Sequence, residues 1–345
     1  MQKDAAKKKE NKQNAIARGG GSADRKVSET DPNKKEQERE MDLEIDPSNA
    51  CKFDRPTHAI LLVSGLHPSF NHGIEVPRMK SPIITARSSH RIKLSKIDPD
   101  GTDGFDKQEA LKKFTQLREK ISQLQEILYA EQQRSLLLIF QAMDTGGKDG
   151  AIKNLCGGLD PAGLHIKDFK APSQQELEHD FLWRVHQAVP GKGMIGVWNR
   201  SHYEDVLIVR VHKLVPKKVW KARYDQINRF EKNLTENGTT IVKFMLHISK
   251  DEQKKRLEAR LDVPEKWWKF NPGDIKERTF WDDYQRAYED AINCCSTDYA
   301  PWHIVPANHK WARNLFISDK VWRVLKKIDP RYPKLSFDPK TIRID

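Results

Sequence analysis

The sequence predicts an α/β fold of three layers, in which a parallel sheet is covered by helices on both faces. The first observation behind this prediction is the continuous apolar run at residues 135–140, which is typical of a strand buried on both sides. The second is that strand-like and helical segments alternate after this run, as in a parallel sheet with helical crossovers. The strand-like segments cover residues 164–169, 193–198, 240–248 and 302–306. The helical segments cover residues 150–157, 173–189, 216–236, 250–261, 274–294 and 308–328.

A further helix is predicted before the first strand. Between Lys107 and Arg134, apolar residues recur at the three-to-four spacing of a helix with one buried face. These residues are Leu111, Phe114, Leu117, Ile121, Leu124 and Leu128. The helix leads straight into the apolar strand at residues 135–140.

The N-terminal part of the chain differs in composition from the rest. Residues 1–50 have no aromatic side chain and contain eleven basic and eleven acidic residues, so we expect a disordered charged tail. Residues 51–90 carry one strand-like run, at 59–63, among Pro and Gly residues, and are expected to be an accessory extension without an assigned role. Residues 91–333 form the predicted main domain, with a lid at about 256–275, and residues 334–345 a C-terminal tail.

The basic charge of the chain lies on the part that should fold. The net charge is +12 and the pI about 9.3, and because the first 50 residues are neutral overall, 50 basic and 38 acidic residues remain in the rest. A folded basic surface implies a polyanionic partner, either a nucleic acid or a chain of phosphates. The N-terminus has no apolar segment typical of a secretory signal, and no run is long enough to span a bilayer, so a cytoplasmic protein without a membrane partner is expected. Four cysteines lack zinc-site spacing and are predicted to be reduced thiols: Cys51, Cys156, Cys294 and Cys295.

The loop after the first strand carries the features of a phosphate-binding site. Its sequence, AMDTGGKDG at residues 142–150, lies between a strand and a predicted helix that opens at residue 151, and it resembles the P-loop pattern GxxxxGK[ST]. Three glycines, Gly146, Gly147 and Gly150, let backbone N–H groups face one anion, and Lys148 adds a mobile positive charge. The alternative interpretation is a Gly-rich turn with a solvated lysine.

This loop departs from the P-loop pattern in a way that predicts a metal. Ala142 stands in place of the first glycine and Asp149 in place of the hydroxyl residue. Asp144 and Asp149 would repel a phosphate unless a divalent cation lay between them, so we predict Mg²⁺, with Mn²⁺ as an alternative.

A second segment should reach the same edge of the sheet. The strand ending at Trp198 is followed by Asn199 and Arg200, with Glu204 and Asp205 shortly after. The planar guanidinium of Arg200 suits a phosphoryl group in transfer. The alternative is that Arg200 merely pairs with Glu204 or Asp205.

A third cluster is basic and follows the helix that opens near residue 250. Arg256, Arg260, Lys266 and Lys269, interrupted by Pro264, suggest a hinged positive flap that closes over phosphates and excludes water. The alternative is a solvated charged face whose aromatic residues, at 267, 268 and 270, only pack.

Together these segments closely resemble the polyphosphate kinase 2 family, and in particular its class III subgroup. The resemblance runs from about residue 91 to the region of Pro333. The matching motifs are QAMDTGGKDG (141–150), NRSHYEDVL (199–207), LHISKDEQ (246–253), RLD (260–262) with KWWKF (266–270), and YAPW (299–302) with PAN (306–308).

The resemblance implies a P-loop kinase-like fold similar to that of thymidylate kinases, Mg²⁺ dependence and a basic channel for inorganic polyphosphate. It implies phosphorylation of the adenine nucleotides AMP and ADP by polyphosphate, no specific nucleic-acid partner, and an assembly of two or four copies. It also implies that the loop residues, the Arg200 segment and the basic residues of the lid carry binding or catalysis, with Asp144 as the carboxylate that orients the acceptor. Two alternatives remain open, an ATP-dependent nucleotide kinase and a non-catalytic binder of polyanions or nucleic acid.

Overall fold

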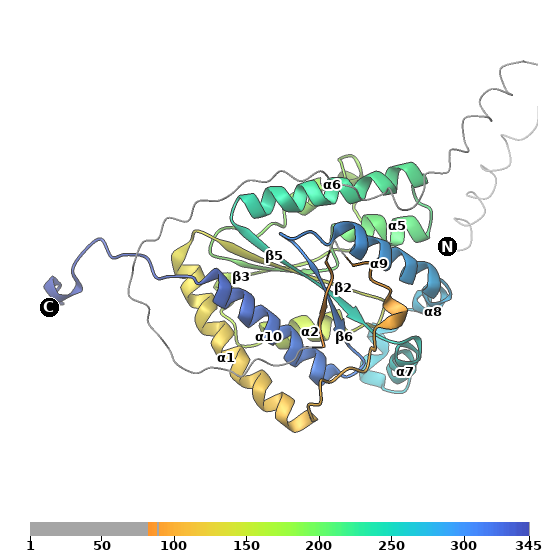
Figure 1. Ribbon diagram of the computed structural model, residues 1–345, viewed down its shortest axis with the longest axis horizontal. Helices are drawn as coiled ribbons and strands as arrows, with labels where there is room; N and C mark the ends of the chain where they lie inside the picture. Colours follow the sequence, from red (N-terminus) through yellow and green to blue (C-terminus); the bar gives the residue numbers. More distant parts are fainter. Residues whose placement is uncertain (1–81, 88–89, 345) are drawn as a thin grey trace, which may run out of the picture. The chain divides into compact units, whose positions relative to one another are not determined.

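The computed structural model describes residues 82–87 and 90–344, which belong to one structural unit of the chain. The predicted tail at residues 1–50, the strand-like run at 59–63 and Cys51 lie outside the described residues. Within the described part the predicted α/β class is confirmed, because a central sheet lies between two layers of helices (Figure 1).

Six strands form one sheet in the order β1-β6-β5-β2-β4-β3. All neighbouring strands are parallel except β1, which runs antiparallel to β6. The strands are β1 (Ile84–Thr85), β2 (Ser135–Ala142), β3 (Leu164–Asp168), β4 (Ile195–Asn199), β5 (Thr239–His247) and β6 (Trp302–Pro306). After β2 the chain first forms β3 and β4 on one side of this strand, and then β5 and β6 on its other side. In open α/β sheets such a switch point is where ligands bind, at the carboxyl ends of the strands.

Two groups of helices cover the sheet (Figure 1). On one face α1 (Lys107–Glu131), α2 (Lys148–Cys156) and α10 (Lys310–Ile328) pack together. On the other face lie α5 (Ile208–Val211), α6 (Lys217–Glu236) and α9 (Trp281–Cys295). The predicted lid corresponds to α7 (Lys250–Leu261), η7 (Pro264–Lys269) and α8 (Pro272–Thr279). The remaining short helices are η4 (Leu94–Lys96), η5 (Pro161–Gly163), α3 (Gln174–Leu177), α4 (Trp183–His186), η6 (His202–Val206) and η8 (Pro339–Thr341).

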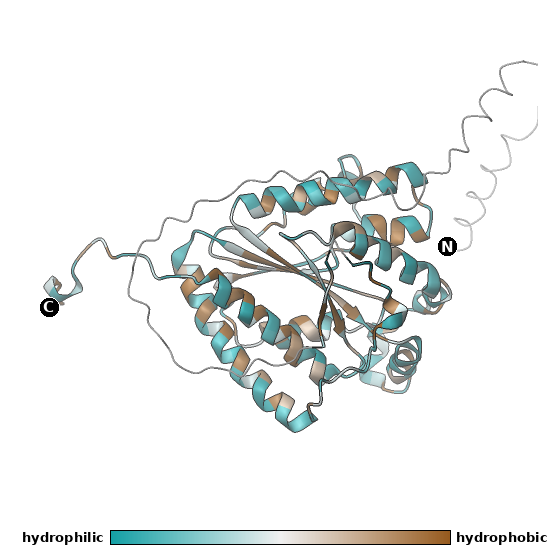
Figure 2. Cartoon of the chain, in the orientation of Figure 1, coloured by the Kyte–Doolittle hydropathy of each residue, from teal (hydrophilic) through white to brown (hydrophobic). Residues whose placement is uncertain are grey.

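The core explains why β2 reads as an uninterrupted apolar run. All eight of its residues are buried, and successive side chains point to opposite faces of the sheet. Leu137 and Ile139 pack with Phe230 and Leu234 of α6, whereas Leu138 belongs to the larger cluster that includes α1 and α10. Figure 2 shows the hydrophobic colour gathered on the strands, while the helices carry alternating apolar and polar stripes.

The single helix predicted at residues 173–189 is wrong. Ser173 begins α3 with a capping box, but α3 ends at Leu177 and α4 begins at Trp183. Between them the carboxylate of Asp180 accepts a hydrogen bond from Leu182 N–H over 2.9 Å. Such local side-chain bonds compete with the helical backbone pattern and break it. The helix predicted at 274–294 is likewise divided, into α8 and α9.

Part of the stretch predicted as an accessory extension lies in the sheet. In β1, Ile84 is opposite Ile304 of β6, and Ala86 N–H donates to Trp302 O over 2.9 Å. β1 therefore shields the edge of β6. Across the described residues, no helix combines the length and apolar composition that a bilayer-spanning segment needs.

Candidate active site

A loop of residues 143–147 joins β2 to α2 at the carboxyl end of the central strand. Gly146 N–H donates to Met143 O over 2.9 Å, and Thr145 and Gly147 have positive φ angles of 60° and 94°. α2 begins at Lys148, two to three residues earlier than the predicted start at residue 150 or 151. N–H groups in the first turn of a helix have no intrahelical acceptor, so this turn presents donors to an anion.

Two of the three predicted loop glycines are required by the packing. A Cβ on Gly146 would lie 2.5 Å from the Cβ of Ala142, and a Cβ on Gly147 would lie 2.4 Å from Arg313 Nη1. At Gly150 the closest atom would be 3.5 Å away, an ordinary contact. The tight turn therefore depends on Gly146 and Gly147, and a side chain fits at Gly150.

The side chain of Lys148, predicted to be a mobile positive charge, is held in place inside the protein. Its side chain is buried, and Nζ donates to Ala142 O over 3.0 Å. Burial lowers the pKa of Lys148, and the neighbouring carboxylate of Asp144 only partly offsets this effect. To reach a bound phosphate, the ammonium group has to leave this carbonyl.

Arg200 faces the loop from β4. Its N–H donates to Phe140 O over 3.0 Å and its φ is 62°, so its backbone is held beside β2 in the left-handed region. Nη2 lies 3.6 Å from Asp144 Oδ1, and the two side chains remain 40% and 32% exposed. Burial alone would lower the pKa of Arg200, but the carboxylates of Glu204 and Asp144 outweigh it and raise that pKa. Asp144 and Arg200 thus form an accessible pair of opposite charges at the end of β2.

The two carboxylates that follow Arg200 have different surroundings. Asp205 pairs with Arg223 at 3.0 Å and does not line the pocket described below. Burial raises the pKa of Asp205 to about 6 even though Arg223 opposes this shift. Glu204 does line the pocket, and burial raises its pKa against the effect of Arg200. Of the predicted residues, Glu204 lies with Asp144 and Arg200, and Asp205 does not.

Asn199 connects the end of β4 to α2. Its Nδ2 donates to Asp149 Oδ1 over 2.8 Å, and its Oδ1 is buried with no hydrogen-bond partner in the described part of the chain. No cluster of three or more His, Cys, Asp or Glu residues in that part is arranged to hold a metal ion. Mg²⁺ does not need one, because it commonly takes one or two carboxylates and completes its shell with water and phosphate oxygens. Asp144, Asp149 and the unpaired oxygen of Asn199 fit that donor set.

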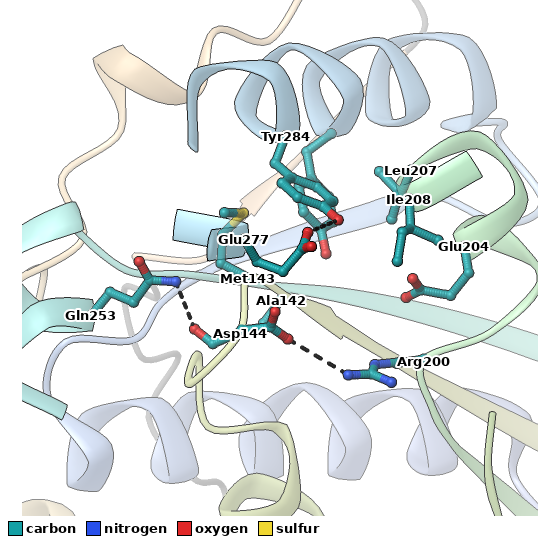
Figure 3. Close-up of a pocket in the computed structure, with 11 residues that line it drawn as sticks. Ala142, Met143, Asp144, Arg200, Glu204, Leu207, Ile208, Gln253, Glu277 and Tyr284 are labelled. Carbon is teal, nitrogen blue, oxygen red and sulfur yellow. Dashed lines mark hydrogen bonds and ion pairs between the residues drawn. The ribbon is translucent and has the colours of Figure 1, made fainter. Parts of the chain in front are cut away.

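An open pocket lies beside the Asp144–Arg200 pair (Figure 3). It encloses about 540 Å³ including the open solvent at its mouth. In Figure 3, Asp144 lies between Gln253 and Arg200, and Tyr284 of α9 contacts Glu277 of α8 over 2.8 Å. The lining residues are Ala142, Met143, Asp144, Arg200, Glu204, Leu207, Ile208, Gln253, Glu277, Tyr284 and Tyr288. The pocket therefore combines an apolar wall with a charged end at the loop.

The basic cluster of the lid divides into buried and exposed members. Arg260 pairs with Asp274 at 3.1 Å and donates to Lys269 O over 3.0 Å, so it joins α7 to η7 and α8. Lys266 and Lys269 are exposed on η7. Trp268 is 78% exposed and lies 4.7 Å under Lys269 Nζ, so it is not a buried packing residue.

The predicted phosphate-binding role of Arg256 does not agree with its contacts. Its Nε donates to Glu252 Oε1 over 2.7 Å, Nη1 to the carbonyls of Thr145 and Gly146, and Nη2 to those of Ala307 and Asn308. A guanidinium has five N–H groups, and all five are used here. Arg256 therefore braces the loop and has no donor left for a phosphate.

Several residues of the site were not predicted from the sequence. Arg313 of α10 lies against Gly147. In the sequence it could have been found as a charged residue on the apolar face of a helix, between Ala312 and Leu315. Tyr284 and Tyr288 share one face of α9 through their spacing of four residues, a pattern that does not distinguish pocket from core. Gln253 and Glu277 gave no separate signal.

Comparisons with known proteins agree on one family. The family model described as polyphosphate kinase 2 matches residues 104–333. An AMP/ADP-polyphosphate phosphotransferase of Meiothermus ruber is 51% identical over 246 residues, which cover 71% of this chain and 92% of that protein. An ADP-polyphosphate phosphotransferase of Rhodopseudomonas palustris is 47% identical over 228 residues, covering 63% of this chain and 79% of that protein.

A solved structure gives the same result for the fold. The crystal structure of polyphosphate kinase 2 from Arthrobacter aurescens TC1 superimposes with a TM-score of 0.74 at 45% sequence identity. The match covers 77% of this chain and 96% of that one.

Proposed function

Because this chain belongs to the polyphosphate kinase 2 family, we propose that it transfers the terminal phosphoryl group of inorganic polyphosphate to AMP or ADP with Mg²⁺. It is an enzyme of the phosphotransferase class. The observation that carries the proposal is the pocket at the end of β2, where Asp144 and Arg200 face each other above the buried Lys148.

The reaction makes one bond and breaks one bond. A terminal phosphate oxygen of the acceptor attacks the terminal phosphorus of polyphosphate, and the bond to the bridging oxygen of the chain breaks. The nucleotide gains one phosphoryl group and polyphosphate leaves one unit shorter. The attacking oxygen is already anionic, so the site needs no base to remove a proton. Its task is to bring two anions into line against their repulsion.

The chain's own donors can reduce this repulsion. We assign the donor phosphate to the N–H groups of Gly147 and of the first turn of α2, with Lys148 moving up from Ala142 O. The N–H of Gly146, which was also predicted to bind phosphate, already donates to Met143 O. We assign Arg200 to the phosphoryl group in transfer, since it lies on the pocket side and keeps 40% of its side chain exposed. When Arg200 moves from Asp144 to a phosphate, its guanidinium exchanges one anionic partner for another.

Asp144, Asp149 and Asn199 Oδ1 are the residues that would hold Mg²⁺. The cation would supply charge neutralisation between donor and acceptor phosphates. Asn199 also fixes Asp149 through its 2.8 Å hydrogen bond, which holds this carboxylate at the start of α2.

We place the acceptor nucleotide in the pocket with its phosphate towards Arg200. Met143, Leu207 and the ring of Tyr288 offer an apolar surface for the base. Glu277 and Tyr284, which hydrogen-bond to each other, offer polar groups at the same wall. Lys266 and Lys269, exposed on the lid, are proposed to contact the polyphosphate chain as it leaves the loop.

The donor assay separates this function from the two alternatives. The enzyme is supplied with Mg²⁺, polyphosphate and AMP, without ATP, and the products are separated by chromatography. Formation of ADP and ATP is the expected result. An ATP-dependent nucleotide kinase would make ADP only when ATP is added. A non-catalytic binder would make no product with either donor and would retain RNA or polyphosphate on a column.

A further inference from the structure

Two arginines from different helices hold the outer side of the phosphate loop. Arg256 of α7 donates through Nη1 to the carbonyls of Thr145 and Gly146, both over 3.1 Å. Arg313 of α10 donates through Nη1 to the carbonyl of Gly147 over 3.1 Å. Three successive loop carbonyls are therefore bound by guanidinium groups. We refer to Arg256 and Arg313 together as the arginine clamp.

The clamp ties the loop to the rest of the domain. Through Nη2, Arg256 also binds the carbonyls of Ala307 and Asn308, which follow β6, over 2.6 and 3.0 Å. Gln253, one turn earlier on α7, donates to Asp144 O over 3.0 Å. The loop is thereby anchored to α7, which leads into the lid, and to the segment between β6 and α10.

Arg313 is an unusual buried cation. It is 2% exposed, and its Nε and Nη2 donate to the neutral amide oxygen of Asn314 over 3.1 and 2.7 Å. Among the described residues no carboxylate lies within ion-pair distance of it. Burial and the nearby Arg256 lower the pKa of Arg313 to about 10. A buried charge without a counter-ion is costly, which indicates a role other than stabilising the empty fold.

The peptide geometry gives the consequence for phosphate binding. In a trans peptide the carbonyl of one residue and the N–H of the next point in opposite directions. The clamp holds the carbonyl of Gly146, and it holds the carbonyl of Gly147 together with the N–H of Ala151 in α2, which donates to the same oxygen over 3.0 Å. The N–H groups of Gly147 and Lys148 are therefore turned to the opposite side. That side is where the proposed donor phosphate binds.

We propose that the arginine clamp is a positioning device for the phosphotransfer reaction, in which Arg313 and Arg256 hold the loop carbonyls so that the N–H groups of Gly147 and Lys148 stay aimed at the donor phosphate. The expected effect on kcat rests on the proposed function. The expected effect on the order of the loop rests on the loop geometry alone. Neither arginine contacts substrate in this scheme.

The test compares two arginines of the same helix. Arg313→Met removes the contact to the loop, and Arg323→Met is the matched control, because Arg323 lies about 15 Å further along α10 and pairs with Asp319 at 2.8 Å. Hydrogen–deuterium exchange is measured on peptides covering residues 143–150. Arg313→Met is expected to speed exchange in these peptides by about 10- to 100-fold, since charge-assisted hydrogen bonds are lost. Arg323→Met is expected to leave it unchanged.

Kinetics with polyphosphate and AMP provide the second readout. For Arg313→Met, kcat is expected to fall by about 10- to 100-fold while the KM for AMP changes less than about two-fold, because the acceptor pocket is intact. Arg313→Lys keeps the charge with fewer donors and should recover part of kcat. If Arg313→Met does not fold, Arg313→Lys is used in its place for both the exchange and the kinetic measurements.

The proposal is overturned if the loop peptides of the Arg313 variant exchange as in the wild type, even when activity falls. It is also overturned if loop exchange rises but kcat stays at the wild-type value. The exchange result does not depend on the reaction. A wild-type enzyme that fails to use polyphosphate would refute the proposed function and leave the exchange data to decide on the clamp.

Discussion

Lys148→Met should remove activity without lowering stability. Lys148 has one hydrogen bond, to Ala142 O at 3.0 Å, and no carboxylate within 4 Å in the described structure. Burial lowers its pKa, so the fold disfavours the charged form. Methionine keeps much of the side-chain volume and removes that charge. Loss of the hydrogen bond lowers the free energy of unfolding by about 1 kcal/mol, and removal of the buried charge raises it, so the two effects oppose each other.

We therefore expect the free energy of unfolding to change by no more than about 1 kcal/mol, which corresponds to a Tm within about 4 °C of the wild type. Turnover should behave differently. Removing a preorganised cation that stabilises charge in the transition state costs on the order of 10³ in kcat, or about 4 kcal/mol.

Lys243 is the matched control, as a second buried lysine with a different environment. Its Nζ lies 2.5 Å from Glu231 Oε2, 2.8 Å from the hydroxyl of Tyr203 and 2.7 Å from Cys295 O. Lys243→Met leaves the buried carboxylate of Glu231 without its counter-ion, which costs about 3–5 kcal/mol. The Tm should fall by about 6–20 °C.

The two variants are compared by thermal melting and by the rate of ADP formation from polyphosphate and AMP. Near-normal turnover of Lys148→Met would refute the assignment of Lys148 to the reaction. A fall in Tm as large as that of Lys243→Met would show that Lys148 acts on the fold.

Three further predictions concern pH, the loop and the lid. Burial raises the pKa of Asp205 from 3.8 to about 6, so its ionisation weakens the fold as the pH rises through this interval, by up to about 3 kcal/mol. Urea unfolding at pH 4.5 and 7.5 should show that the free energy of unfolding falls less for Asp205→Asn than for the wild type. Equal decreases in the two proteins would contradict the burial argument. Gly147→Ala should lower both Tm and kcat because it collides with the arginine clamp, whereas Gly104→Ala, at φ 79° with no neighbour, carries only the backbone strain of about 1 kcal/mol. Equal effects of the two alanines would argue against the collision. Replacing Lys266 and Lys269 with Ala should raise the KM by about three- to ten-fold for long polyphosphate and much less for tripolyphosphate. An effect independent of chain length would count against a channel over the lid.

The fold could be predicted from local patterns along most of the chain. The apolar run at residues 135–140 and the alternation of strands and helices after it are read within windows of a few residues, and so is the glycine loop between β2 and α2. Where a local polar contact ended a helix, as at Asp180, the periodicity alone did not show it. The nearness of Asp144 to Arg200 followed from their places after neighbouring parallel strands.

The sequence by itself determined the glycine loop after β2, the charged residues after β4 and the basic segment that follows β5, because each depends on neighbours in the chain. The tertiary structure decided which of these residues face the pocket. It turned Asp205 towards Arg223 and placed Arg256 and Arg313 on the loop carbonyls, across more than 100 residues of sequence. The physical reason is that a guanidinium looks the same in any sequence, and whether it meets a phosphate, a carboxylate or a main-chain carbonyl depends on which strands and helices the fold brings together.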